Sequence, residues 1–72
     1  MNQYDLDWIF GFHPPTEEQL VRHKAIRFAA NDFAAILLAN TPPSADQSAA
    51  IRLLRDCVMT ANASIALEGR LS

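Results

Sequence analysis

The sequence has few of the residues that usually stabilise a very small domain. Its 72 residues include one cysteine and two histidines, so an internal disulfide and a multi-cysteine metal site are excluded. Burying its own apolar surface barely offsets an ordering cost of about 1.5 kcal/mol per residue in a chain this short. Because half of the residues are apolar, we expect the chain to gain stability by self-association.

Positive charge and long apolar runs are also scarce. A net charge of −2 argues against a nucleic-acid polymer as the partner, because such binders are usually basic. The start of the chain does not resemble a signal peptide, and no apolar run reaches the roughly 18 residues needed to span a bilayer. We therefore expect no membrane partner, and the single thiol fits a reducing cytoplasm.

Motifs of catalysis are missing as well. With only Gly11 and Gly69, the chain contains no Walker loop, dinucleotide fingerprint or nucleophile elbow. Its carboxylates are scattered, and neither Asp32 nor Asp56 has a partner at a spacing typical of acid–base catalysis. The sequence therefore predicts a protein that is not an enzyme and needs neither a cofactor nor a metal ion.

Two helix start signals of the same form occur, T-E-E-Q from Thr16 and S-A-D-Q from Ser44. In such a capping box the hydroxyl accepts an unpaired backbone N–H, and the glutamine bonds back to the capping residue. The acidic residues that follow suit the positive end of the helix dipole. These signals predict helices over residues 17–39 and 45–68.

The residues at the helix ends determine the fold. The first helix should stop at Asn40, because the following Thr-Pro-Pro cannot continue it. Gly69 is the expected C-cap of the second helix, and the short connection makes the two helices antiparallel neighbours. The predicted fold is all-α: one domain with a helical hairpin at 16–72, preceded by an aromatic-rich segment at 1–15.

Apolar side chains at alternating spacings of three and four residues predict the contact between the two helices. We expect Asn62, beside this contact, to fix the helix register or to bond a neighbouring polar group, with a ligand contact as the alternative. Cys57 should be a small buried side chain. The expected contact residues are Ile51, Leu54, Val58, Ala61 and Ile65 on the second helix, and Ile26, Ala29 or Ala30, Phe33, and Ile36 or Leu37 on the first.

More apolar side chains are present than this contact can use. Residues 33–39 (F-A-A-I-L-L-A) are apolar on every side of the helix, and a two-helix hairpin cannot cover all of them. Exposed apolar patches of this size mark contacts with other chains. The sequence therefore predicts a compact symmetric oligomer with this segment at the centre of a subunit interface.

Four of the six aromatic residues lie within the first twelve positions: Tyr4, Trp8, Phe10 and Phe12. The two prolines that follow exclude an ordinary helix interior, so these rings belong to a loop or a short irregular element. There they either cover the core or form a stacking surface for a flat ligand.

Basic side chains cluster early in the first predicted helix, where Arg22, Lys24 and Arg27 fall within six positions. Lys24, Arg27 and Asn31 share the helix face opposite the expected contact, so they could simply form a solvated surface. In an antiparallel assembly, however, the aromatic rings of one subunit would meet the cations of another. Rings beside cations suit a small nucleotide, whose bases stack and whose phosphates need positive charge.

The runs FHPPTEEQ, RHKAIRFAA and DFA, followed by TPPSADQSAAIRLLRDCVMTANASIA, resemble a known family. Its members are small phage proteins that counter CBASS immunity by sequestering cyclic oligonucleotide signals. The same hairpin domain occurs in phage proteins that counter the Thoeris system. The resemblance covers residues 12–66 and rests on four motifs in the same order and at similar spacing.

This resemblance implies a sponge that works in the cytoplasm of the infected bacterial host. Family members form hexamers of helical hairpins, hold cyclic dinucleotides intact between subunits, and in some cases bind cyclic trinucleotides at separate sites. By position, Phe12 corresponds to the ring that stacks on a base, and Arg27 to the basic residue that faces the phosphates. The resemblance also implies His13 and Lys24 as neighbours in that ligand site.

The sequence departs from the family pattern at two positions, with Phe12 where Tyr is frequent and Thr60 where Trp is usual. The first removes a hydroxyl from the stacking ring, and the second changes the packing of one helix face. Three other functions remain open: a sponge for cyclic ADP-ribose signals, a structural or adaptor hairpin without a nucleotide ligand, and a phosphodiesterase. The last is disfavoured by the absence of an acid–base pair and a metal site.

Overall fold

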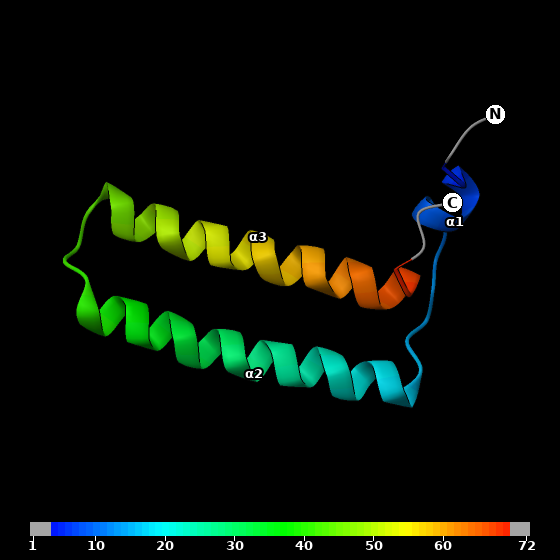
Figure 1. The fold of residues 1–72 in the computed structure, drawn as a ribbon, viewed down its shortest axis with the longest axis horizontal. Coiled ribbons are helices and arrows are strands. Elements are labelled where there is room, and N and C mark those ends of the chain that lie inside the picture. The colour runs from blue at the N-terminus through cyan, green and yellow to red at the C-terminus, as the bar shows by residue number, and fades with distance from the viewer. Residues whose placement is uncertain (1–3, 70–72) are drawn as a thin grey trace.

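A computed structural model describes residues 4–69. This part of the chain contains three helices and no strand: α1 (Leu6–Phe10), α2 (Glu17–Asn40) and α3 (Ala45–Leu67). Helices α2 and α3 lie side by side in opposite directions, and α1 lies at the open end of the hairpin (Figure 1). The predicted all-α hairpin is confirmed, although the outer ends of the predicted ranges 1–15 and 16–72 lie outside the described residues.

The predicted capping box at the start of α2 is present. The backbone N–H of Gln19 donates to Thr16 Oγ1 over 3.2 Å, and the Thr16 N–H donates to Gln19 Oε1 over 3.0 Å. Two of the unpaired donors at this helix end are therefore satisfied within the chain. The helix begins at Glu17 as predicted, and Asn40 is its last residue, one beyond the predicted end.

The second predicted capping box forms only in part. The backbone N–H of Gln47 donates to Ser44 Oγ over 3.1 Å. The Gln47 side-chain amide does not return to Ser44; it donates instead to the carbonyl oxygen of Thr41 over 3.0 Å and to the Thr41 hydroxyl over 3.1 Å. The reason is that α2 ends in the same turn, and its last carbonyls also need donors. Gln47 therefore ties the end of α2 to the start of α3.

Helix α3 ends one residue earlier than predicted. Glu68, and not Gly69, is the C-cap, with a left-handed φ of 51°, and Gly69 follows with φ 72°. A left-handed backbone is costly for a residue with a Cβ, but the Glu68 carboxylate is held from α2. Gln19 Nε2 donates to it over 2.8 Å and Arg22 Nη2 over 2.6 Å. These bonds close the open end of the hairpin.

The contact between α2 and α3 uses most of the α2 residues predicted for it. Its half-covered positions include Ile26, Ala30, Ala34 and Leu37, whereas Phe33 is 50% exposed and Ile36 56% exposed. Ile26, Ala30 and Leu37 are therefore confirmed, Leu37 being the member of the Ile36-or-Leu37 alternative that the contact uses, whereas the prediction of Phe33 is wrong. Ala30 and Ala34, both half covered, occupy the middle of the contact, and Phe33 lies beside it.

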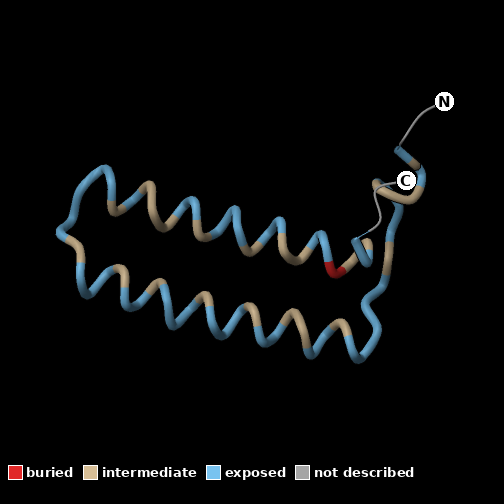
Figure 2. Tube along the Cα trace, in the orientation of Figure 1, coloured by how far each residue is buried: buried red, intermediate tan, exposed pale blue. Residues whose placement is uncertain are grey.

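On α3 the predicted contact stripe is confirmed. Its five members are all at least half covered, and Ile65, at 9% exposed, is the one buried residue among residues 4–69 (Figure 2). Asn62 fixes the register as expected, because its Oδ1 accepts a hydrogen bond from His23 Nδ1 over 2.8 Å. Cys57 is exposed, so its prediction as a buried side chain is wrong; it lies beside the stripe and not within it.

The hairpin is one helix layer thick, with extents of 48 × 30 × 15 Å. Its accessible surface is 5733 Å², whereas a compact monomer of this mass exposes about 4,450 Å² by the usual scaling with size. Large apolar side chains on several faces account for part of the excess, as most of the tube in Figure 2 is exposed. Leu20, Phe28, Phe33, Ile36, Leu38, Leu53 and Met59 are each at least 50% exposed.

Candidate ligand-binding surface

The aromatic N-terminal segment forms a short helix, where the sequence predicted a loop or a short irregular element. Asp5 caps α1, its carboxylate accepting the Trp8 backbone N–H over 3.1 Å. Gly11 is the C-cap of α1, and the position suits glycine because a Cβ there would lie 2.6 Å from the Asp7 carbonyl oxygen. The chain then leaves the helix with Phe12 88% exposed. Phe12 therefore does not cover the core, and its ring is available for stacking.

His13 fastens this segment internally. Its Nε2–H donates to the Trp8 carbonyl oxygen, and its ring lies against the Trp8 indole with centroids 4.1 Å apart and planes inclined by 46°. Both side chains are half buried. His13 therefore holds the turn that presents Phe12.

On α2, Lys24 and Arg27 gather around one aromatic ring. Lys24 Nζ lies 5.4 Å and Arg27 Cζ 5.9 Å from the centroid of the Phe28 ring, within the range of cation–π attraction. Phe28 is 56% exposed, so the three side chains form a cationic, aromatic surface that faces solvent. Phe28 was not predicted as part of the site, although its position four residues after Lys24 could have indicated it.

A groove runs along one face of the hairpin between α2 and α3, with a cavity volume of about 320 Å³. Arg27 and Asn31 line it from α2, and Arg55 and Met59 line it from α3. Its remaining lining residues are apolar members of the helix contact: Ala30, Ala34, Ile51, Leu54 and Val58. Arg55 is a functional candidate that sequence reasoning missed, since it lies 28 positions after Arg27 and only the antiparallel packing brings both to one groove.

The opposite face carries a second groove of about 290 Å³ with a different character. Phe33 and Ala29 line it from α2, and Cys57 and Ala61 from α3, together with shared contact residues. No Asp, Glu, Lys or Arg among residues 4–69 lines this groove. The two faces of the hairpin therefore differ, with cations beside one groove and uncharged side chains along the other.

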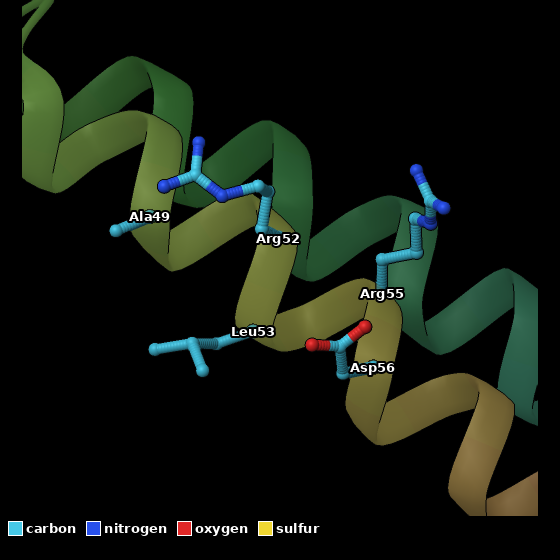
Figure 3. A pocket seen from close by; sticks show the side chains of 5 residues that line it. All are labelled: Ala49, Arg52, Leu53, Arg55 and Asp56. Atoms are coloured by element: carbon cyan, nitrogen blue, oxygen red, sulfur yellow. The ribbon is translucent and has the colours of Figure 1, made fainter.

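A further concavity of about 320 Å³ lies on the outer surface of α3, lined by Ala49, Arg52, Leu53, Arg55 and Asp56. Figure 3 shows Arg52 and Arg55 extending from the same side of the helix, with Leu53 and Asp56 on another side. Arg55 lines both this concavity and the groove between the helices. It is thus the one of these two arginines that reaches the face of Arg27.

Charge pairing within the described residues leaves these cations available. The ion pairs among residues 4–69 join Arg22 to Glu18 over 3.5 Å and to Glu68 over 2.6 Å, so Arg22 stabilises the open end of the hairpin. The two hydrogen bonds, from Gln19 first and then from Arg22, also lower the pKa of Glu68 below its ordinary value of 4.5. Lys24, Arg27 and Arg55 are exposed and have no such carboxylate partner within the described chain.

The four residues predicted as ligand contacts fall into two groups. Lys24 and Arg27 lie together beside Phe28, and Phe12 and His13 lie on the loop before α2. Among residues 4–69, no hydrogen bond, ion pair or ring contact joins one group to the other. The structure of one chain therefore leaves these two groups as separate exposed clusters, and the prediction that neighbouring subunits combine them stays a prediction.

Residues 4–69 contain no group of three or more His, Cys, Asp or Glu side chains placed to hold a metal ion. Of the described helices, none combines enough length with enough apolar character to cross a lipid bilayer. The fold and its exposed surfaces instead define a helical hairpin domain that displays rings and cations to solvent.

Comparison with known proteins identifies the family. The family model described as "Acb2/Tad1, hairpin domain" matches residues 5–66, which is most of the chain and includes α1, α2 and nearly all of α3. The chain therefore belongs to the Acb2/Tad1 hairpin family, the phage anti-CBASS and anti-Thoeris sponges that it was found to resemble. No curated protein and no solved structure gives a significant match.

Proposed function

We propose that this protein binds and sequesters cyclic dinucleotide signals of bacterial CBASS immunity without cleaving them. It acts in the cytoplasm of the infected host and also accepts cyclic trinucleotides if a separate site forms in the assembly. The observation that carries the proposal is the exposed cluster of Lys24, Arg27 and Phe28, found in a chain of the sponge family. Sequestration requires affinity and copy number, so no catalytic group is needed.

The chemistry of the ligand fits the side chains on offer. A cyclic dinucleotide has two flat bases and two phosphodiester anions. The exposed Phe12 ring offers a stacking surface, and base–aromatic stacking contributes about 1–3 kcal/mol per base. Arg27 and Lys24 offer donors to the phosphates. His13, hydrogen-bonded to the Trp8 carbonyl, holds the loop that carries the ring.

A symmetric assembly completes this site. The surface of the chain exceeds that of a compact monomer by about 1,300 Å², enough to supply the roughly 800 Å² per partner of a standard interface. Phe33, Ile36 and Leu38, all at least half exposed, form the apolar centre of the contact. A hexamer, as the family resemblance implies, repeats Phe12 and Arg27 around symmetry axes, so one ligand meets two copies of each.

The family also includes sponges that counter Thoeris immunity, so a cyclic ADP-ribose signal is the second candidate ligand. Adenine and phosphate groups occur in both ligand classes, and the same rings and cations suit either. A different second function, an adaptor hairpin that binds a partner protein, is favoured by the exposed apolar side chains but leaves the cations beside Phe28 without a role.

The test is isothermal titration calorimetry with 3′,3′-cyclic GMP-AMP, followed by release of the ligand by heat and its chromatography. We expect tight binding and recovery of intact nucleotide, whereas a linear product would show hydrolysis and refute the sponge. A cyclic ADP-ribose isomer titrated in parallel separates the two ligand classes. Absence of binding to any cyclic nucleotide tested would favour the adaptor.

Two matched variants test whether the ligand binds beside Arg27. Arg27→Glu should abolish binding while the mass of the oligomer, measured by light scattering, stays unchanged. Arg52→Glu is the control, because it makes the same charge change on the outer surface of α3. Equal loss of affinity in both variants would mean that overall charge, and not the site beside Phe28, governs binding.

A further inference from the structure

Charge is distributed unevenly around the groove that contains Arg27. The chain has more acidic residues, eight, than lysines and arginines, six. Yet the described residues that line this groove include two arginines, Arg27 and Arg55, and no carboxylate. Each arginine comes from a different helix, so the antiparallel packing puts one arginine side chain on either side of the groove. An anionic ligand is the partner that such a surface favours.

The rest of the groove narrows the class of anion. Its floor consists of the apolar side chains between the helices, including Ala30, Leu54 and Val58, and Met59 lines it while 57% exposed. An apolar floor with a polarisable thioether suits the flat face of an aromatic ring, and guanidinium groups suit phosphate oxygens, which they bind through two parallel hydrogen bonds. A nucleotide has both parts.

We propose that Arg55 is a ligand-binding residue that, with Arg27, binds the phosphate groups of a nucleotide lying along this groove. The proposal rests on the proposed function and adds to it a contact from α3. The family resemblance assigned the phosphate contact to α2 alone. Arg55 increases affinity for ligands with more than one phosphate, because the second guanidinium can reach an anion that Arg27 does not neutralise.

Arg52 provides the matched comparison within the same helix. It lies one turn before Arg55 and is equally a surface arginine, but it lines only the outer concavity, where Asp56 is also present (Figure 3). It does not line the groove between the helices. The proposal therefore predicts different effects for the same substitution at these two positions.

The experiment compares wild type, Arg55→Gln and Arg52→Gln by titration calorimetry with 3′,3′-cyclic GMP-AMP at two salt concentrations. Arg55→Gln should weaken binding about ten- to a hundredfold, the loss expected for one charge-assisted hydrogen bond, and should make the affinity less dependent on salt. Arg52→Gln should change the affinity less than twofold. Equal effects of the two variants would overturn the proposal.

A second measurement tests whether Arg55 has a structural role instead. Light scattering and thermal unfolding of Arg55→Gln should match those of wild type, and a change in oligomer mass or a loss of stability would reassign Arg55 to a subunit contact and overturn the proposal. Arg55→Lys keeps the charge but not the planar fork, so it should regain only part of the lost affinity. Full loss in the lysine variant would point to packing instead.

The design also separates failure of this inference from failure of the proposed function. If wild type binds no cyclic nucleotide, the sponge is refuted, and the groove is then probed with inorganic pyrophosphate by nuclear magnetic resonance of the arginine Nε–Hε groups. Joint shifts of the Arg27 and Arg55 signals, without a shift of Arg52, would support the two-arginine anion site on its own. Shifts at neither residue would overturn it.

Discussion

The hydrogen bond between His23 and Asn62 is the link between α2 and α3 whose strength can be worked out most directly. His23 Nδ1 donates to Asn62 Oδ1 over 2.8 Å, and both side chains are half buried. A well-formed bond of this kind contributes about 0.5–1.5 kcal/mol net. Removing one partner also leaves the other polar group half buried without a bond, which adds a desolvation cost of about 1 kcal/mol or less at this exposure.

We therefore expect Asn62→Ala to lower the free energy of unfolding by about 1–2 kcal/mol. For a chain of 60–100 residues, each kcal/mol corresponds to about 4–8 °C in Tm. His23→Ala should cost a similar amount. The double variant should cost less than the sum of the two by about 1 kcal/mol, because the second substitution no longer breaks the bond.

The assay is chemical denaturation of wild type, the two single variants and the double variant, monitored by circular dichroism. One fixed protein concentration is used, because association adds to stability. Leu at both positions is a further variant, because an apolar pair of similar shape should restore most of the lost stability. The reasoning would be refuted by single effects that add to within about 0.3 kcal/mol, the limit for independent sites.

The remaining predictions concern binding and the two ends of the hairpin. Phe12→Ala should cost about 1–3 kcal/mol of binding free energy per stacked base, measured by calorimetry, while Phe12→Tyr should keep or increase the affinity. Ile65→Ala should destabilise the protein by about 2 kcal/mol, the low end for a core truncation, because the cover over this side chain is only one helix layer thick; a loss below 0.5 kcal/mol in denaturant titration would contradict it. The pKa of Glu68 is lowered from its ordinary value of 4.5, so its bonds to α2 stabilise the fold at neutral pH and are lost as the carboxylate is protonated at acid pH below 4.5. Glu68→Gln should therefore make Tm depend less on pH in this acid range. Gly11→Ala should disturb the end of α1, because the new Cβ would meet the Asp7 carbonyl oxygen at 2.6 Å, and affinity should fall with Phe12 displaced even though α2 and α3 melt unchanged.

Signals that act over a few residues could be read from the sequence with accuracy. The capping box at Thr16, the Thr-Pro-Pro stop after Asn40 and the start of α3 after Ser44 depend on bonds between neighbours in the chain. Such bonds form in nearly any environment, so the bounds of α2 and α3 were correct to within one residue at each end, whereas α1 was not predicted as a helix. The cluster of Lys24 and Arg27 was predictable for the same reason, since residues three positions apart share a helix face.

Tertiary packing decided which of several similar apolar faces of α2 contacts α3. Helix α2 is apolar on several sides, so its periodicity could not distinguish a face with Phe33 from one with Ala30 and Ala34. In the packed hairpin Ala30 and Ala34 are half covered and Phe33 is 50% exposed. The end of α2 accepts the Gln47 side chain at Thr41, and the α2 side chains Gln19 and Arg22 hold Glu68 as the cap of α3.

The sequence by itself determined that this chain is a helical hairpin with excess apolar surface. Capping signals and apolar periodicity act locally, and a single layer of two helices cannot bury all the apolar side chains that the composition supplies. Only the tertiary structure decided which residues meet between the helices. Arg27 and Arg55 are far apart in the chain, and they line one groove because antiparallel packing aligns a middle turn of α2 with a middle turn of α3. Such alignment depends on how two surfaces fit, and no local pattern specifies it.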